Sequence, residues 1–171
     1  MKTKTINVYE YNELSKEAKR RALNDWRNKY DNLFLQSELQ GECNELIKNY
    51  GIECTSNFPI CLYSLSYCQG DGLMFYGTFK WKQYVVDIKH SGHYYHSYSK
   101  FIELTDESKE DETDASDEDY KAFEAIYQEI CKKLEQQGYD MIESENSEEY
   151  FIDMCEANEW TFTSDGVMEN L

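Results

Sequence analysis

The sequence predicts an α+β fold, in which helices pack on one face of an antiparallel β-meander of four to five strands. Apolar residues recur at helical spacing near both ends of the chain. Residues 52–104 instead alternate with a period of two and are rich in aromatic and β-branched residues. The resulting order is strand, two helices, meander, two helices, strand, which is typical of α+β proteins. A length of 171 residues predicts one domain, 1–171, with an acidic loop at about 103–117.

The N-terminal residues predict a strand followed by a helix. "INVYEY", residues 6–11, has apolar or aromatic side chains at alternate positions, as a strand requires. Residues 12–30 then predict a helix, with Ser15 as its N-cap. Apolar residues recur four apart on one side of this helix, at Leu14, Ala18, Ala22, Trp26 and Tyr30.

Residues 31–51 predict a second helix. Asp31 or Asn32 has the side chain of an N-cap, and Gly51 has the freedom of a C-terminal stop. The apolar stripe of this helix comprises Leu39, Cys43, Leu46, Ile47 and Tyr50.

The middle of the chain predicts the meander. Five short runs alternate in the strand period and are separated by turn-like pieces: "GIECTSNF", "ICLYSLSYC", "GLMFYGTFKW", "QYVVDIKH" and "YYHSYSKFIEL". "QGDG" joins two of these runs. We expect Gly70 and Gly72 to adopt positive φ there, in a hairpin turn with a bulge.

The C-terminal part predicts two helices and a last strand. Residues 116–138 form the first helix, in which Ser116 and Asp119 fit a capping box and Gly138 is the expected end. Its stripe comprises Tyr120, Phe123, Ile126, Tyr127, Ile130 and Leu134. A shorter helix over 146–160 is capped at Asn146 or Ser147, and "WTFT" is a strand followed by a turn at Asp165-Gly166.

Cysteine usage and hydropathy limit the class of protein. None of the six cysteines forms a C-x-x-C pair, and the N-terminus lacks the apolar region of a secretory signal. We therefore expect reduced thiols that serve as small apolar residues, no zinc site and no membrane span. Cys68, with a histidine further along the chain, matches no cysteine-enzyme signature, and we interpret it as a core strand cysteine.

The charge is unevenly distributed. Residues 1–100 hold 13 Lys and Arg and 11 Asp and Glu, whereas residues 101–171 hold 4 and 23, a formal net charge of −19. "ELTDESKEDETDASDEDY", residues 103–120, holds ten carboxylates and one lysine. A solvated loop is the ordinary interpretation of such a run. A calcium site is not supported, because the D-x-[DN]-x-[DN]-G pattern is absent.

The alternative is that these carboxylates imitate nucleic-acid phosphates and occupy a basic cleft of another protein. The negative charge repels nucleic acid and anionic membranes and attracts basic protein surfaces. The candidate partner-binding residues are Asp106, Glu107, Glu110, Asp111, Glu112, Asp114, Asp117, Glu118, Asp119 and Glu124.

Two other stretches have candidate chemistry. His90, His93 and His96 lie within seven residues, but strand alternation places His93 on the opposite face from the other two. We therefore expect no bound metal, and no cofactor. Single-stranded bases could stack on an aromatic platform, yet the few flanking lysines and the net charge oppose phosphate, so we interpret these side chains as half-buried sheet residues. The platform would comprise Tyr63, Tyr67, Phe75, Tyr84, Tyr94, Tyr95 and Tyr98.

Several stretches together resemble a family of small phage and prophage proteins, sometimes labelled antitoxins of a toxin–antitoxin stability system. They are "YSLSYCQGDGLMFYGTF" (63–79), "KHSGHYYHSYS" (89–99), "ANEWTFTSDG" (157–166) and "YNELSKEAKRRAL" near the start. The resemblance implies phage origin and action in the host bacterial cytoplasm. It carries over no catalytic residue.

By analogy in charge, small acidic phage proteins resemble inhibitors of restriction enzymes and of CRISPR nucleases. We therefore expect a non-enzymatic inhibitor of a host nucleic-acid-handling defence complex, most readily a CRISPR nuclease. Its partner would be a basic nucleic-acid-binding protein, with no direct contact to nucleic acid or membrane. The alternatives are an antitoxin that contacts a toxin directly and a metal-dependent enzyme that uses the three histidines.

Overall fold

The computed structural model describes residues 6–30, 32, 34–56, 59–106, 108 and 113–169. Their contacts divide the chain into two compact units. The sheet unit comprises residues 33–140, and the terminal unit combines residues 1–32 with 141–171. The single domain expected from the length stays a prediction.

The sheet unit confirms the α+β prediction, with a mostly antiparallel sheet. Its strands are β1 (Ile52–Cys54), β2 (Ile60–Ser64), β3 (Gly72–Trp81), β4 (Tyr84–His90), β5 (Lys100–Asp106) and β6 (Thr113–Asp114). Strands β3, β4, β5 and β6 follow one another as antiparallel neighbours. Both β1 and β2 pair with β3, β1 with residues 79–81 and β2 with residues 72–76. Among these strands β1 alone departs from the order of a meander, because it pairs with β3 rather than with β2, the next strand in the chain.

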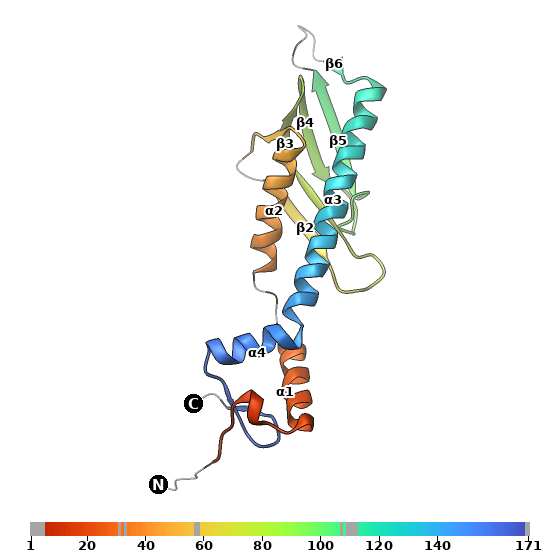
Figure 1. Ribbon diagram of the computed structural model, residues 1–171. Coiled ribbons are helices and arrows are strands. Elements are labelled where there is room, and N and C mark those ends of the chain that lie inside the picture. Colours follow the sequence, from red (N-terminus) through yellow and green to blue (C-terminus); the bar gives the residue numbers. More distant parts are fainter. Residues whose placement is uncertain are drawn as a thin grey trace, which may run out of the picture. The chain divides into compact units, whose positions relative to one another are not determined.

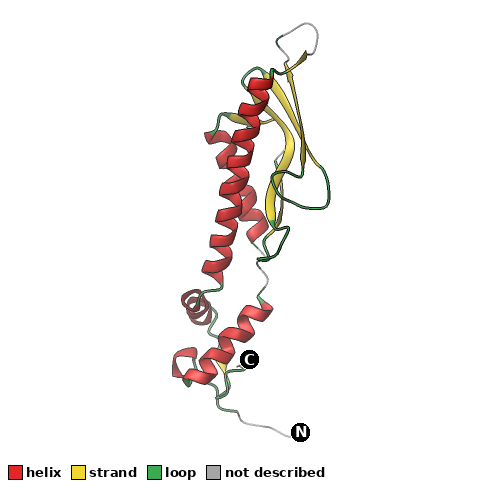
Figure 2. Cartoon of the chain, turned by 90° about the vertical axis from the view of Figure 1, so that its right-hand side faces the viewer, coloured by secondary structure: helices red, strands yellow, loops and turns green. Residues whose placement is uncertain are grey.

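Two helices of this unit cover one face of the sheet, α2 (Leu35–Asn49) and α3 (Asp117–Glu145) (Figures 1 and 2). The predicted stripes face the sheet: Leu39, Cys43 and Ile47 of α2 are buried. In α3 the buried stripe comprises Phe123, Tyr127, Ile130, Cys131 and Leu134. Tyr127 is fully buried, and its hydroxyl donates a hydrogen bond of 3.1 Å to the backbone carbonyl of Phe75 in β3.

Helix ends were predicted less well than helix faces. The N-cap of α2 is Phe34 rather than Asn32, while Asp31 lies outside the described residues. The expected end of α3 at Gly138 is wrong, since the helix continues to Glu145. Gly138 is buried, and a Cβ there would lie 2.5 Å from Cδ1 of Leu65. This glycine therefore permits close packing of α3 on the loop after β2 instead of stopping the helix.

The terminal unit is built from both ends of the chain. It contains a 3-10 helix η1 (Tyr11–Glu13), α1 (Lys16–Lys29), α4 (Glu148–Ala157) and the hairpin of β7 (Thr161–Phe162) and β8 (Met168–Glu169). As predicted, Ser15 caps α1 and Ser147 caps α4, each accepting a hydrogen bond from a backbone N–H three residues on. The unit has its own core of Tyr11, Leu14, Ala18, Ala22, Leu23, Phe151, Cys155 and Phe162.

The strand predicted for residues 6–11 is wrong. Only Tyr9 forms a bridge, with Phe162, and the chain then turns into η1. The ring of Tyr11 is needed in the core, where it meets Phe151 edge-on with a centroid distance of 5.1 Å. Burial of that side chain outweighs the alternating pattern, because strand propensity depends on context.

No helix among the described residues is both long enough and apolar enough to cross a membrane.

A first prediction concerns Gly166 in the turn between β7 and β8. Its φ is +84°, and a Cβ there would lie 2.2 Å from the carbonyl oxygen of Ala18. Because backbone must move to make room, we expect Gly166→Ala to lower the free energy of unfolding by roughly 1–3 kcal/mol. Gly41 is the control, since it is exposed within α2 and a Cβ there meets nothing within 4 Å. Gly41→Ala should raise the stability by about 1 kcal/mol, as helix propensity predicts.

Urea denaturation monitored by circular dichroism measures both variants. Equal stability of the Gly166 variant and the wild type would contradict the close approach of the turn to α1.

Candidate functional site

The predicted acidic site is only partly a free surface. Asp114, Asp117 and Glu118 are exposed, at β6 and in the first turn of α3. Carboxylates at a helix N-terminus are stabilised by the helix dipole, so this position favours them as charged groups. These three residues can meet a partner without breaking an ion pair seen among the described residues. Glu107, Glu110, Asp111 and Glu112 lie outside the described residues.

Asp106 does not lie in a solvated loop, contrary to our expectation. It is the last residue of β5 and is only 4% exposed. Its Oδ1 accepts hydrogen bonds from the backbone N–H of Ser108, at 3.0 Å, and from the Ser108 hydroxyl, at 2.6 Å. This carboxylate organises the turn after β5 and is not available to a partner.

Asp119 and Glu124 bind other residues of the sheet unit. Asp119 accepts from the Lys82 ammonium at 2.6 Å and from the Tyr84 hydroxyl at 2.7 Å. Lys82 is also the main cause of the lowered pKa of Asp119. The Ser116 hydroxyl accepts from the Asp119 N–H at 3.2 Å, which is one half of the predicted capping box, and it donates to the Asp119 carboxylate at 3.2 Å. These contacts attach the start of α3 to the turn between β3 and β4.

Glu124 lies one and a half turns further along α3 and binds Lys100 of β5 at 2.8 Å. The Lys100 side chain is only 6% exposed, so its charge is compensated within the protein. Like Asp119, Glu124 is thus mainly a link between α3 and the sheet.

A second surface lies at the opposite end of the sheet, where loop 65–71 and loop 91–99 meet. Two glycines make this meeting possible. Gly70 has φ +97°, and a Cβ there would lie 2.7 Å from the Tyr94 ring. Gly72 does not have the positive φ that we expected. It is glycine because a Cβ would lie 2.6 Å from Cβ and 2.8 Å from Cα of His96.

Asp71 holds loop 65–71 in place. Its Oδ2 accepts from the backbone N–H of Ser66 at 2.6 Å, the N–H of Cys68 at 3.0 Å and the Tyr139 hydroxyl at 3.0 Å. Its Oδ1 accepts from the Ser64 hydroxyl at 3.0 Å. The Cys68 N–H is the largest cause of the lowered pKa of Asp71, while burial and Asp71 together raise the pKa of Tyr139 to about 12. One carboxylate therefore connects the loop to α3.

The interpretation of the tyrosines as half-buried sheet residues is wrong for four of them. Tyr67, Tyr94, Tyr95 and Tyr98 lie in the two loops and are exposed, because β5 begins only at Lys100. Phe75 and Tyr84, from the same predicted platform, are buried in strands, and Tyr63 is partly buried. The sequence signal for a loop was present: serine, glycine and histidine interrupt the strand period in "HSGHYYHSYS".

His90 and His96 take part in local contacts at the start of loop 91–99 and within it, and His93 is exposed in the same loop. Nε2 of His90 lies 3.1 Å from the Tyr94 carbonyl oxygen, and the rings of Tyr94 and His96 stack with centroids 5.6 Å apart. Nδ1 of His96 lies 3.1 Å from the hydroxyl of Ser99, which is only 7% exposed and so inaccessible as a nucleophile. Among the described residues, no group of three His, Cys, Asp or Glu could hold a metal ion.

All six cysteines are free thiols, as expected. Cys43, Cys61, Cys131 and Cys155 are buried, and burial is the largest cause of the raised pKa of Cys155, to about 12. Cys68 is exposed in loop 65–71, so its assignment to a core strand is wrong. Its thiol lies 3.4 Å from the Ser66 carbonyl oxygen.

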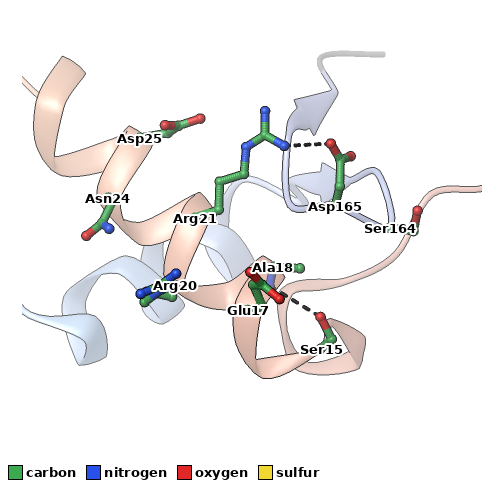
Figure 3. A pocket seen from close by; sticks show the side chains of 9 residues that line it. All are labelled: Ser15, Glu17, Ala18, Arg20, Arg21, Asn24, Asp25, Ser164 and Asp165. Atoms are coloured by element: carbon green, nitrogen blue, oxygen red, sulfur yellow. Dashed lines mark hydrogen bonds and ion pairs between the residues drawn. The ribbon is translucent and has the colours of Figure 1, made fainter.

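The terminal unit has a cleft of about 550 Å³ between α1 and the turn after β7 (Figure 3). Arg21 reaches across it to Asp165 with an ion pair of 2.6 Å, and both side chains are more than half exposed. Arg20 also lines the cleft, together with Glu17 and Asp25. Because the acidic groups outnumber the basic ones, the cleft is not suited to an anionic ligand. The exposed ion pair adds at most about 1 kcal/mol to the stability of the turn.

Comparisons with protein-family models, with curated proteins and with solved structures gave no match. The phage resemblance therefore stays a prediction.

A second prediction tests the close approach of the loops. Gly72→Ala should lower the free energy of unfolding by roughly 1–3 kcal/mol, because backbone of loop 91–99 must shift to admit the methyl group. Gly92 in the same loop is the comparison, since it has φ +100° but no atom within 4 Å of a Cβ. Gly92→Ala should cost about 1 kcal/mol from backbone strain alone. Thermal denaturation measures both, and a Gly72 variant that melts like the wild type would contradict the packing of His96.

A third prediction concerns Asp71. Because its pKa is lower in the folded protein than the ordinary value of about 3.9, its charge stabilises the fold above that pH. This contribution is lost as the pH falls through the folded-state pKa. Asp71→Asn should therefore be less stable than the wild type at neutral pH, and the difference should shrink under acidic conditions. Asp153→Asn, at an exposed position of α4, controls for the loss of one charge.

Urea denaturation at neutral pH and near pH 3 gives the comparison. A difference between wild type and Asp71→Asn that grows on acidification would show that the charge of Asp71 opposes folding.

Proposed function

We propose that this protein is a phage-encoded, non-enzymatic inhibitor that binds the basic nucleic-acid cleft of a host defence nuclease, most readily a CRISPR nuclease. The observation that supports this proposal best is the exposed group of Asp114, Asp117 and Glu118, which lies on the folded elements β6 and α3. The start of α3 is fixed by Lys82 and Tyr84 through Asp119, so these charges occupy defined positions. A cleft that normally receives phosphates attracts such a surface.

Charge density indicates how far this imitation goes. Helix α3 contains nine acidic and three basic residues over 29 residues. At 1.5 Å per residue this is about one net negative charge per 7 Å, whereas duplex DNA has one per ~1.7 Å. The helix therefore has the same sign of charge as a nucleic acid, with about a quarter of the linear charge density of duplex DNA. Electrostatic attraction accelerates the encounter, and tight binding requires further contacts.

The test is cleavage of target DNA by a panel of purified CRISPR nucleases and restriction enzymes, with the protein added before the DNA. We expect inhibition of at least one enzyme, and competition with the nucleic acid. A variant with Asp114→Asn, Asp117→Asn and Glu118→Gln should bind about tenfold more weakly, since exposed ion pairs contribute roughly 0.5 kcal/mol each. Raising the salt from ~0.1 M to ~1 M, which shortens the screening length from ~10 Å to ~3 Å, should weaken the wild type.

The matched control carries Glu149→Gln, Asp153→Asn and Glu156→Gln on α4, all at exposed positions. It loses the same net charge at a different place and should inhibit like the wild type. Neutral residues in the first turn of α3 cost about 0.3–1 kcal/mol of helix stability each, so folding is checked by circular dichroism. Equal loss of inhibition in both variants would mean that net charge alone acts. Inhibition by the α3 variant as strong as that of the wild type, or inhibition of no enzyme, would overturn the proposal.

A further inference from the structure

Four exposed tyrosines lie in loops 65–71 and 91–99, which meet where Tyr94 packs over Gly70. We call this set, Tyr67, Tyr94, Tyr95 and Tyr98, the tyrosine end. Tyr98 is 73% exposed and Tyr67 is 63% exposed, which is unusual for such large rings. Tyrosine is enriched at the centres of protein interfaces, because it offers a large contact area with little loss of side-chain freedom.

The tyrosine end is held in a defined conformation. Asp71 fixes loop 65–71, and Tyr94 and His96 pack over Gly70 and Gly72, as described above. Tyr67 has φ +57°, a left-handed conformation that costs a non-glycine residue about 1 kcal/mol. Its ring lies 4.8 Å from that of Tyr139 in α3. The fold thus maintains a strained backbone that presents an exposed ring, and such strain is concentrated at functional positions.

The charges around these rings favour a cationic partner. Asp71 belongs to loop 65–71, and burial followed by the negative charge of Asp71 raises the pKa of Glu135 in α3, so two carboxylates lie close to this loop. The lysines at this end are compensated: Lys89 binds Asp87 at 2.9 Å and Glu103 at 3.0 Å, and Lys100 binds Glu124. A phosphate would therefore meet carboxylates and ring faces rather than available ammonium groups. The face of an aromatic ring is negative and attracts cations.

The chain itself makes this kind of contact. The Lys100 ammonium lies 5.7 Å from the ring centroid of Tyr98 and 5.5 Å from that of Tyr127. Because Lys100 is almost buried, the outer face of Tyr98 remains available. Among protein cations, the planar guanidinium of arginine stacks best on aromatic rings.

We propose that the tyrosine end is a second contact surface, which binds arginine side chains of a protein partner by stacking on Tyr98. The inference rests on the proposed function in one respect, that the partner is basic. It supplies the short-range contacts that the acidic start of α3 lacks. Along α3, residues 119 and 139 are about 30 Å apart, so the two surfaces can engage separate parts of one partner.

The experiment measures binding of a hexa-arginine peptide by nuclear magnetic resonance titration of the whole protein, and compares Tyr98→Phe with Tyr98→Leu. Phenylalanine keeps the ring, whereas leucine keeps only an apolar side chain of similar size. We expect the peptide to shift the ring resonances of the tyrosine end. We also expect Tyr98→Leu to bind about two- to fivefold more weakly, with Tyr98→Phe close to the wild type. Phe34→Leu controls for loss of an exposed ring elsewhere in the sheet unit.

The spectrum of each variant shows directly whether the variant is folded. Glu135→Gln is a second test, because it leaves every ring in place and removes a nearby carboxylate. This variant should also bind the peptide more weakly. Unchanged affinity of Tyr98→Leu would mean that only the acidic residues hold the peptide, and would overturn the inference. Equal losses for leucine and phenylalanine would assign the contact to the hydroxyl and would likewise overturn it. So would tighter binding of a single-stranded oligothymidine at the same rings.

Nuclease inhibition is not used in this experiment, so the two proposals fail separately. If the protein inhibits no nuclease but binds the peptide at Tyr98, the proposed arginine-binding surface stands and the proposed function fails. Conversely, if the protein inhibits a nuclease through Asp114, Asp117 and Glu118 but the peptide shifts no ring resonance, the proposed function stands and the arginine-binding surface fails.

Discussion

The packing of α3 on β3 is the interaction on which the rest of the sheet unit depends. The ring of Tyr127 packs at a tilt against that of Phe75 with centroids 4.7 Å apart, and its hydroxyl donates to the Phe75 carbonyl. Burial of each such aromatic side chain contributes about 1.5–3 kcal/mol. Strand β3 pairs with β1, β2 and β4, so one contact fixes the helix relative to most of the sheet. Both candidate surfaces lie against α3, one at its start and one near Tyr139, and both take their positions from this packing.

Much of this architecture follows from local pattern. An apolar stripe such as Phe123, Tyr127 and Leu134 must be buried, and the alternating runs between α2 and α3 in the chain must form a sheet. The fold class could therefore be predicted from the sequence. The residues at which helices and strands begin and end could not be predicted in this way. Glycine at 138 favours a helix stop in isolation, but the helix gains more from close packing on Leu65 than it loses in propensity, about 1 kcal/mol. Tyr11 similarly joins a core that includes Phe151, Cys155 and Phe162 from the far end of the chain.

The candidate site was predicted only in part, for a related reason. A run of carboxylates looks uniform in sequence, yet its members have different roles. Asp119 pairs with Lys82, which is 37 residues away in the chain, and Asp106 is buried at a strand end. Such long-range pairing has no local signature. The tyrosines show the opposite error: an aromatic run predicts burial in a strand, but close approach at two glycines places it in an exposed loop.

The two surfaces suit different stages of association. Sparse exposed carboxylates act over a screening length of about 10 Å, so they influence the rate and orientation of encounter more than the lifetime of a complex. Rings such as Tyr98 act only at contact, where they displace water and stack on a partner group, and contacts of this kind mainly set the dissociation rate. Rigid loops strengthen that effect, because little side-chain or backbone freedom is lost on binding. In the proposed complex, the hydrogen bonds of Asp71, which connect loop 65–71 to Tyr139 of α3, would therefore matter as much as the exposed groups themselves.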